Sequence, residues 1–158
     1  MTFQIHALPP DDFAVLFALS DTQLADIGAL RVVADAPGAF PCRVSLADAD
    51  VGDELVLTNF SHLDERSPYR ASHAIYVRKG VAQATPIPGE VPAVLAARLL
   101  SVRAFGRDHM MTTADVVDGC DLADSLRGVF ADPAVDYVHI HNAKQGCFAA
   151  KATRADQD

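Results

Sequence analysis

Two histidines separated by one residue, His139 and His141, are the side chains of this sequence best suited to chemistry. Neutral imidazole exchanges protons near pH 7 and binds transition metals. The segment Tyr137–Asn142 favours a β-strand because it is rich in β-branched and aromatic residues. Side chains alternate along a strand, so both imidazoles lie on one face, with Cα atoms about 6.5–7 Å apart. Both rings then reach one small ion or one bound anion.

The residues that follow predict a hairpin whose register decides where a cysteine points. Residues 143–146 are typical of a loop, and Gly146 supplies the positive φ that such a loop needs. A four-residue loop pairs Asn142 with Cys147 and puts the thiol on the face opposite the histidines. A loop one residue longer pairs His141 with Cys147 and puts all three side chains on one face. The sequence leaves both registers open.

The strand and helix patterns predict an α+β fold in a single domain. Alternating segments indicate about seven strands, mainly in adjacent antiparallel pairs, and three or four short helices. Helices are expected after Asp11 or Asp12, after the capping box that begins at Ser20, and after Asp121, with a helical turn or two within residues 91–97. Residues 1–154 are expected to form the domain and residues 155–158 a frayed tail.

A polar segment between two predicted strands is expected to cover a pocket. It runs from His62 to Arg70, and it is the most polar connection between strands in the chain. Connections of this length frequently carry binding residues.

Composition narrows the classes of partner. Thirteen basic and 21 acidic residues give a net charge of -8, which argues against nucleic acid and anionic membranes because phosphate binding needs a basic patch. No apolar run approaches the ~20 residues of a membrane-spanning helix, and the N-terminus shows no signal peptide, so we expect a cytoplasmic protein. The three cysteines are widely spaced, which excludes zinc-finger and thioredoxin-type motifs.

Four short motifs together resemble one bacterial family, catalogued as domain-of-unknown-function family 1203, over essentially the whole chain. These motifs are Pro41-Cys42-Arg43-Val44-Ser45, Gly52-Asp53-Glu54-Leu55, Ser67-Pro68-Tyr69-Arg70-Ala71-Ser72, and His139-Ile140-His141-Asn142-Ala143-Lys144 ahead of Gly146-Cys147. The resemblance implies a stand-alone bacterial domain without an assigned activity. The family often has Gly-Pro after the serine that matches Ser72, where this chain has His73-Ala74. The resemblance therefore supports His139 and His141 more than His73.

The first hypothesis for function is a polar pocket that binds a small molecule or an anion. Arginine offers a planar fork to carboxylate or phosphate, and histidine shuttles protons near neutral pH. The candidate residues are Arg43, Tyr69, Arg103, His139, His141, Asn142 and Cys147.

The second hypothesis is a metal-dependent enzyme in which His139 and His141 are ligands of a divalent metal. A catalytic zinc or iron site needs three protein ligands and an open position. The sequence offers His73, Cys42, Cys147 or Asp115 as the third ligand without choosing among them. No motif in the sequence requires a cofactor.

Two further hypotheses remain. Cys147 or Cys42 paired with His141 would provide a nucleophilic thiolate. Alternatively, the domain is not catalytic and binds a protein partner, or a second copy of itself, through an edge strand.

Overall fold

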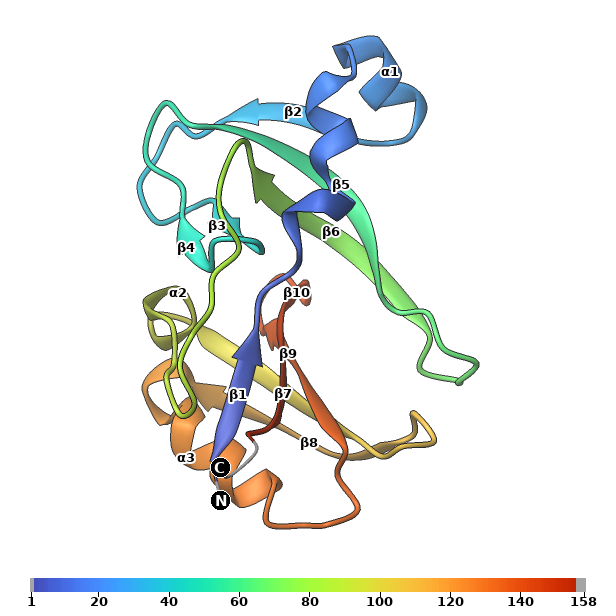
Figure 1. The fold of residues 1–158 in the computed structure, drawn as a ribbon, viewed down its shortest axis with the longest axis vertical. Helices are drawn as coiled ribbons and strands as arrows, with labels where there is room; N and C mark the ends of the chain where they lie inside the picture. Colours follow the sequence, from blue (N-terminus) through green and yellow to red (C-terminus); the bar gives the residue numbers. More distant parts are fainter. Residues whose placement is uncertain (1, 156–158) are drawn as a thin grey trace.

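The computed structural model describes residues 2–155, which form an α+β single-domain fold (Figure 1). Over these residues the strands divide into two five-stranded, mainly antiparallel sheets. We call them the β5 sheet, with strand order β2-β5-β6-β3-β4, and the β9 sheet, with strand order β1-β10-β9-β7-β8. The expected fold class is therefore confirmed, with its strands distributed over two sheets.

The elements of both sheets have the following bounds. The β5 sheet contains β2 (Leu30–Val33), β3 (Pro41–Cys42), β4 (Ala47–Asp48), β5 (Glu54–Leu63) and β6 (Ala71–Arg78). The β9 sheet contains β1 (Phe3–His6), β7 (Leu99–Phe105), β8 (Met111–Asp118), β9 (Tyr137–Asn142) and β10 (Phe148–Arg154). The helices are α1 (Asp21–Asp26), α2 (Ala93–Ala96) and α3 (Leu122–Val129), and the 3₁₀ turns are η1 (Pro10–Asp12), η2 (Ala14–Ala18) and η3 (Gly119–Asp121).

Helix α1 begins and ends where local signals place it. At Ser20 the capping box is complete, because its hydroxyl accepts from the Gln23 amide and the Gln23 side chain accepts from the Ser20 amide. Gly28, with φ of 73°, follows the end of α1. The segment expected as a helix after Asp11 or Asp12 takes the tighter form of η1 and η2.

The main core lies under one face of the β9 sheet. Val138 and Ile140 of β9 are fully buried and belong to the same cluster as Leu122 and Leu126 of α3. Phe130 just after α3 joins them. The strand alternation predicted for β9 is thus confirmed: its aliphatic residues face the helices, so His139 and His141 must face the other way, toward the β5 sheet.

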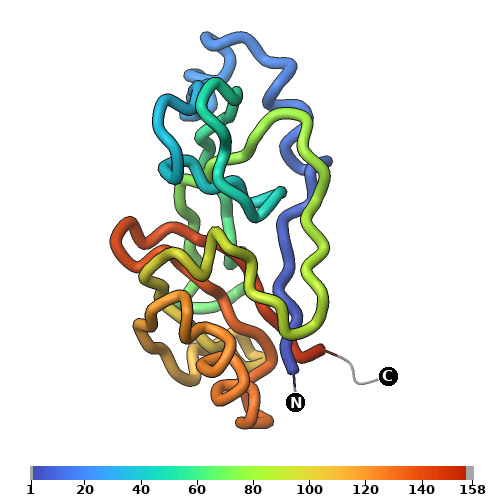
Figure 2. The backbone as a smooth tube through the Cα atoms, turned by 90° about the vertical axis from the view of Figure 1, so that its left-hand side faces the viewer, coloured from blue at the N-terminus to red at the C-terminus, as the bar shows by residue number. Residues whose placement is uncertain are grey.

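The chain crosses between the two sheets twice along neighbouring paths. In Figure 2 the segment that leads from β6 to α2 runs beside β1. The Gly89 amide donates to Phe3 O at 2.8 Å, and the Gln83 side chain donates to Ala7 O at 3.0 Å. These bonds join the segment between β6 and α2 to β1 and to the residue that follows β1.

Strand β5 is longer than its sequence pattern predicts. It continues to Leu63 and pairs with β6, so His62 lies inside the strand and the loop is limited to residues 64–70. The pairing of β5 with β6 shifts by one residue between Ser61 and Leu63, which makes His62 the extra residue of a β-bulge. The expectation of a loop from His62 onward is therefore wrong at its first residues.

Two remaining sequence expectations concern the chain ends and membranes. The expected frayed tail falls mostly on residues 156–158, which lie outside the described residues, whereas the Ala155 amide donates to Thr2 O at 3.1 Å. Within residues 2–155, none of the helices combines the length and the apolar character that crossing a bilayer takes.

Gly119 has a packing role that can be tested against another glycine. A Cβ atom at Gly119 would lie 2.0 Å from Leu95 O and 2.7 Å from the Ala96 carbonyl carbon, so backbone would have to move. We expect Gly119→Ala to lower the free energy of unfolding by about 1–3 kcal/mol, the usual cost of overpacking.

The matched control is Gly128→Ala in α3, where a Cβ atom would have no neighbour within 4 Å. Alanine has the higher helix propensity, so this change should be neutral or stabilising by up to about 1 kcal/mol. Urea denaturation of both variants measures the difference. Equal stabilities would show that the contact between η3 and α2 is not tightly packed.

Candidate functional site

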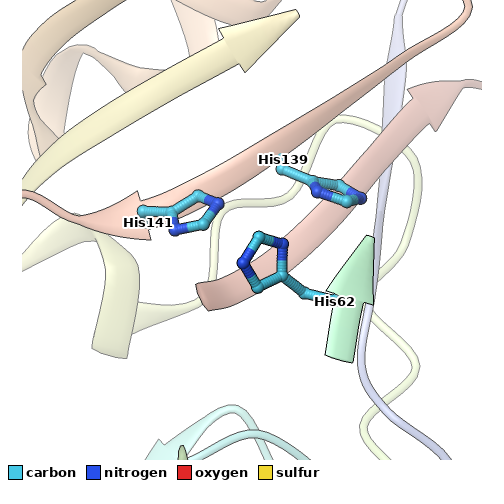
Figure 3. Close-up of side chains that lie close together, drawn as sticks. All are labelled: His62, His139 and His141. Atoms are coloured by element: carbon cyan, nitrogen blue, oxygen red, sulfur yellow. The ribbon is translucent and has the colours of Figure 1, made fainter. Parts of the chain in front are cut away.

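Three histidine side chains from the two sheets converge between them. His139 and His141 come from β9, and His62 comes from β5 (Figure 3). One nitrogen of each ring lies within 4.8 Å of one nitrogen of the other two. The ring centroids of His62 lie 4.8 Å from His141 and 5.6 Å from His139, and those of His139 and His141 lie 6.3 Å apart. We call these residues the histidine cluster.

A β-bulge lies at His62, where β5 reaches the histidine cluster. The extra residue of a bulge bends its strand and re-aims a side chain, and bulges are common beside functional sites. A second bulge lies in β10, where the pairing with β9 shifts between Phe148 and Ala150. Each sheet therefore has a strand with a bulge beside the cluster, β5 in one and β10 in the other. His139 and His141 lie on β9, which pairs regularly with β7.

Each ring of the histidine cluster carries one buried nitrogen without a hydrogen-bond partner among the described residues. These atoms are His62 Nδ1, His139 Nδ1 and His141 Nε2. His141 Nδ1 lies 2.9 Å from Gly146 O and must donate to it, because a carbonyl oxygen only accepts. The proton of neutral His141 is thereby placed on Nδ1, so its Nε2 presents a lone pair to the other rings.

Burial keeps these imidazoles neutral. His139 and His141 are 3% and 1% exposed. Burial, with nearby positive groups, lowers the pKa of His139 to about 3. It also lowers the pKa of His141 to about 4, although the Gly146 carbonyl opposes the shift. For half-buried His62, burial and then the Arg103 charge lower the pKa. Neutral imidazole is the form that binds metals.

Aromatic rings surround the histidine cluster. Phe148 stacks on His62, with centroids 5.6 Å apart and planes at 7°, and meets His139 and His141 edge-on. Phe105 and Tyr137 pack against His139 at 5.5 Å and 5.1 Å. The shell limits the access of water, which strengthens electrostatic interactions inside it.

Arg103 lies beside the cluster without an acidic partner among the described residues. In the register of β7 with β9, Arg103 is opposite His139 and Ser101 is opposite His141, so all four side chains share one face. Arg103 Nε donates to Ser101 Oγ at 3.1 Å. Its positive charge lowers the pKa of all three histidines. Of the sequence candidates, Arg103, His139 and His141 therefore gather at this site.

Three other candidates gather around a separate pocket. Arg43, Asn142 and Cys147 line a cavity of about 360 Å³ together with His73 and Tyr76 of β6. The Asn142 amide donates to Cys147 O at 2.9 Å, so the hairpin has the four-residue loop and the thiol lies on the face opposite the histidines. The geometry thus separates Cys147 from His141, and the proposed pairing of these two side chains is not formed.

The remaining candidates lie elsewhere. Tyr69 is 38% exposed in the β5–β6 loop, and its ring packs edge-on against Phe105 at 5.9 Å. Of the third ligands considered from the sequence, His73 and Cys147 line the other pocket, and Cys42 is buried with its sulfur accepting from the Arg78 amide. Asp115 lies on β8 and lines a shallow groove with α3.

His62 is the site residue that sequence reasoning missed. The alternation Val56, Thr58, Phe60 continues to His62 if β5 is extended by two residues. That extension would have placed His62 on the buried face of the strand. However, His62 and the two histidines of β9 are far apart in the sequence, and no local sequence pattern predicts that they are in contact.

Comparison with known proteins gives a family and no assigned activity. Residues 39–154 match the family described as "Protein of unknown function (DUF1203)". Neither the curated proteins nor the solved structures contain a match to the chain. The matched range covers His62, His139, His141 and Arg103, and all the residues that line the second pocket except Gly38. The family match spans most of the chain and confirms the resemblance that its motifs carry: the protein belongs to the DUF1203 family.

Proposed function

We propose that this protein binds a divalent transition metal ion through His62, His139 and His141. Two observations carry the proposal: one nitrogen of each ring lies within 4.8 Å of one nitrogen of the other two, and each ring has a buried nitrogen without a hydrogen-bond partner among the described residues. A buried polar atom without a partner costs about 1–3 kcal/mol. A bound cation that is coordinated by these nitrogens removes this cost.

The donor set indicates the class of metal. Imidazole nitrogen suits zinc, copper, iron and nickel, whereas magnesium and calcium prefer oxygen ligands. The cluster consists of histidines alone among the described residues. The proposed ion is therefore zinc or another late first-row metal.

The hydrogen bond from His141 to Gly146 O supports the same conclusion. Histidine ligands usually donate their second ring N–H to a carbonyl or carboxylate, which fixes the tautomer and the ring orientation. Here the acceptor is a backbone atom of the β9–β10 turn. His141 is thus oriented for coordination by the same turn that sets the hairpin register.

The geometry requires a small approach of the rings on binding. Bonds of about 2.0–2.1 Å in a tetrahedral site put ligand nitrogens about 3.3 Å apart. The observed separations reach 4.8 Å. His62 can make this adjustment because it is half-buried and lies in a bulge.

Three protein ligands leave a coordination position open, as in catalytic rather than structural zinc sites. Arg103 lies on the same face and has no acidic partner among the described residues. A small anion at the open position would be attracted by both the metal and the guanidinium. We therefore propose a small carboxylate or phosphate ligand for the metal-loaded protein.

Replacement of His62 should abolish metal binding. Protein purified without a histidine tag and freed of metal is titrated with Zn²⁺ by calorimetry, with one ion per chain expected. Loss of a second-shell partner alone weakens binding about 10–100-fold, so His62→Ala should weaken it by at least about 100-fold. At a free Zn²⁺ concentration of about 100 times Kd, the native chain should gain about 2.7 kcal/mol in unfolding free energy, and His62→Ala should not.

The control variant for this experiment is His6→Ala. His6 is exposed on β1 and bonds to Thr153 Oγ1 at 2.7 Å, away from the cluster. It should bind Zn²⁺ like the native chain. The proposal fails if the native chain takes up no zinc, cobalt or iron, or if His62→Ala binds as tightly as His6→Ala.

The metal-free protein should lose stability as the pH falls from about 6.5 toward 4. An unfolded histidine takes up its proton near pH 6.5, whereas folded His139 and His141 remain neutral until about 3 and about 4. The unfolded state therefore binds more protons in this range. Each histidine lowers the free energy of unfolding by up to about 1.4 kcal/mol per pH unit.

This pH dependence is measured by urea denaturation with a chelator present. The double variant His139→Gln/His141→Gln removes both groups and should show a flatter profile than the native chain. A profile with the same slope in both proteins would contradict the assignment of these histidines as neutral, buried groups.

A further inference from the structure

The second pocket contains a buried guanidinium that lacks an acidic partner. Arg43 is 3% exposed, and none of its described contacts is a carboxylate. Its Nε donates to Phe148 O at 2.7 Å, Nη1 donates to Pro41 O, and Nη2 lies 3.1 Å from Cys147 Sγ. Arginine keeps its charge in proteins, and a buried charge is costly unless it is paired.

Cys147 is the acceptor among these three that can carry the compensating negative charge. The two carbonyl oxygens are neutral, whereas a cysteine sulfur can be a thiolate. Burial lowers the pKa of Arg43, and the Cys147 sulfur is the first of the groups that oppose this shift. A thiolate at Cys147 would make the buried contact an ion pair with hydrogen-bond geometry.

Asn142 provides a second donor to the same sulfur. Its Nδ2 lies 3.3 Å from Cys147 Sγ, and its side chain is 5% exposed. The sulfur therefore receives two side-chain donors, from Arg43 and from Asn142. The Asn142 Oδ1 atom is buried without a hydrogen-bond partner among the described residues. A bound molecule that reached this atom would supply the hydrogen-bond donor that it lacks.

These side chains line the cavity of about 360 Å³ between the β9–β10 turn and β6. Arg98 also lines it, and it pairs with Asp48 at 2.6 Å. The cavity does not include any member of the histidine cluster. Asn142 and Cys147 lie on the helix-facing side of their hairpin, whereas His139 and His141 lie on the other side.

We propose that Cys147 is a nucleophilic thiolate, held by Arg43 and Asn142, that reacts with small hydroperoxides in this pocket. The sulfur attacks the terminal oxygen of the hydroperoxide and an S–O bond forms as the O–O bond breaks. Two electrons pass from sulfur to oxygen. The product is a sulfenic acid, and the leaving hydroxide or alkoxide takes a proton from water.

The polar groups around the sulfur fit this class of reactant. An alkyl hydroperoxide has one O–H donor and hydrogen peroxide has two, and either would supply the donor that Asn142 Oδ1 lacks. Arg43 uses three of its N–H groups in the contacts above, and a guanidinium has about five. The remaining donors can stabilise the oxygen that leaves, where negative charge develops.

The reactivity of Cys147 can be compared with two cysteines of the same chain. Cys120 is exposed and serves as an ordinary thiol, and Cys42 is buried and serves as a control for burial. The native chain, freed of metal, is treated with iodoacetamide at mildly acidic pH, and each site is followed by mass spectrometry. Cys147 should react at least about 10-fold faster than Cys120, because the proposed thiolate is the nucleophilic form of a cysteine. A slower reaction than that of Cys120 overturns the proposal.

Substitutions test the role of the two donors. Arg43→Gln removes the charge and should slow the alkylation of Cys147 by at least about 10-fold relative to Cys120. Arg43→Lys keeps the charge and should retain part of the rate. If Arg43→Gln does not fold, Asn142→Leu is the second variant and should also slow the reaction. Arg127→Gln, an exposed arginine paired with Asp124 on α3, is the control and should react like the native chain.

The class of reactant is tested separately with hydrogen peroxide and a cyclic dione that traps sulfenic acids. One equivalent should oxidise Cys147 before Cys120, and Cys147→Ser should remove the trapped product. The chelator stays present, so oxidation by a bound metal is avoided and the outcome is independent of the histidine cluster. Preferential trapping at Cys120, or no trapping at Cys147, would exclude hydroperoxides as the reactant.

Discussion

The register of the β9–β10 hairpin is the constraint on which both sites depend. The four-residue turn closes with the Asn142 amide on Cys147 O and the Gly146 amide on Asn142 O, at 2.9 Å and 2.8 Å. Gly146 has φ of 78°, a conformation that side chains rarely adopt. A shift of one residue would move every side chain of β10 to the other face. Cys147 would then face the histidines, and Phe148 would leave the wall of the cluster.

Because of this register, one short hairpin serves two chemically different environments. On one face His139 and His141 meet His62 inside a shell of aromatic rings, and each ring has a buried nitrogen without a hydrogen-bond partner among the described residues. On the other face Cys147 meets the Arg43 guanidinium and the Asn142 amide. Phe148 contacts both environments: its ring stacks on His62, and its carbonyl oxygen accepts a hydrogen bond from Arg43 Nε. A change in the position of β10 would therefore disturb both environments.

Burial of polar groups between two sheets lowers the stability of the fold, and apolar burial elsewhere in the protein offsets this cost. The aliphatic core of the β9 sheet lies under α2 and α3, where Leu100, Ile140, Leu122 and Leu126 are fully buried. That core buries one face of the β9 sheet in aliphatic contacts, and Phe105, Tyr137 and Phe148 add aromatic burial on the other face. That other face also holds histidines and an arginine, which contribute little apolar burial. Buried polar groups without partners in an otherwise well-packed protein are typical of functional sites.

The sequence by itself determined the strand character of residues 137–142, the shared face of His139 and His141, the capping box of α1 and the family. Each of these depends on residues close together in the chain, whose alternation and turn chemistry follow from local backbone geometry. Only the tertiary structure decided the loop register, the approach of His62, and the contact between Arg43 and Cys147, residues 104 positions apart. Such contacts depend on how two sheets pack and on a bulge that re-aims one side chain. Packing between distant segments leaves no periodic pattern in either of them. The sequence therefore did not show that the predicted site residues belong to two places, with Arg43, Asn142 and Cys147 in one and Arg103, His139 and His141 in the other.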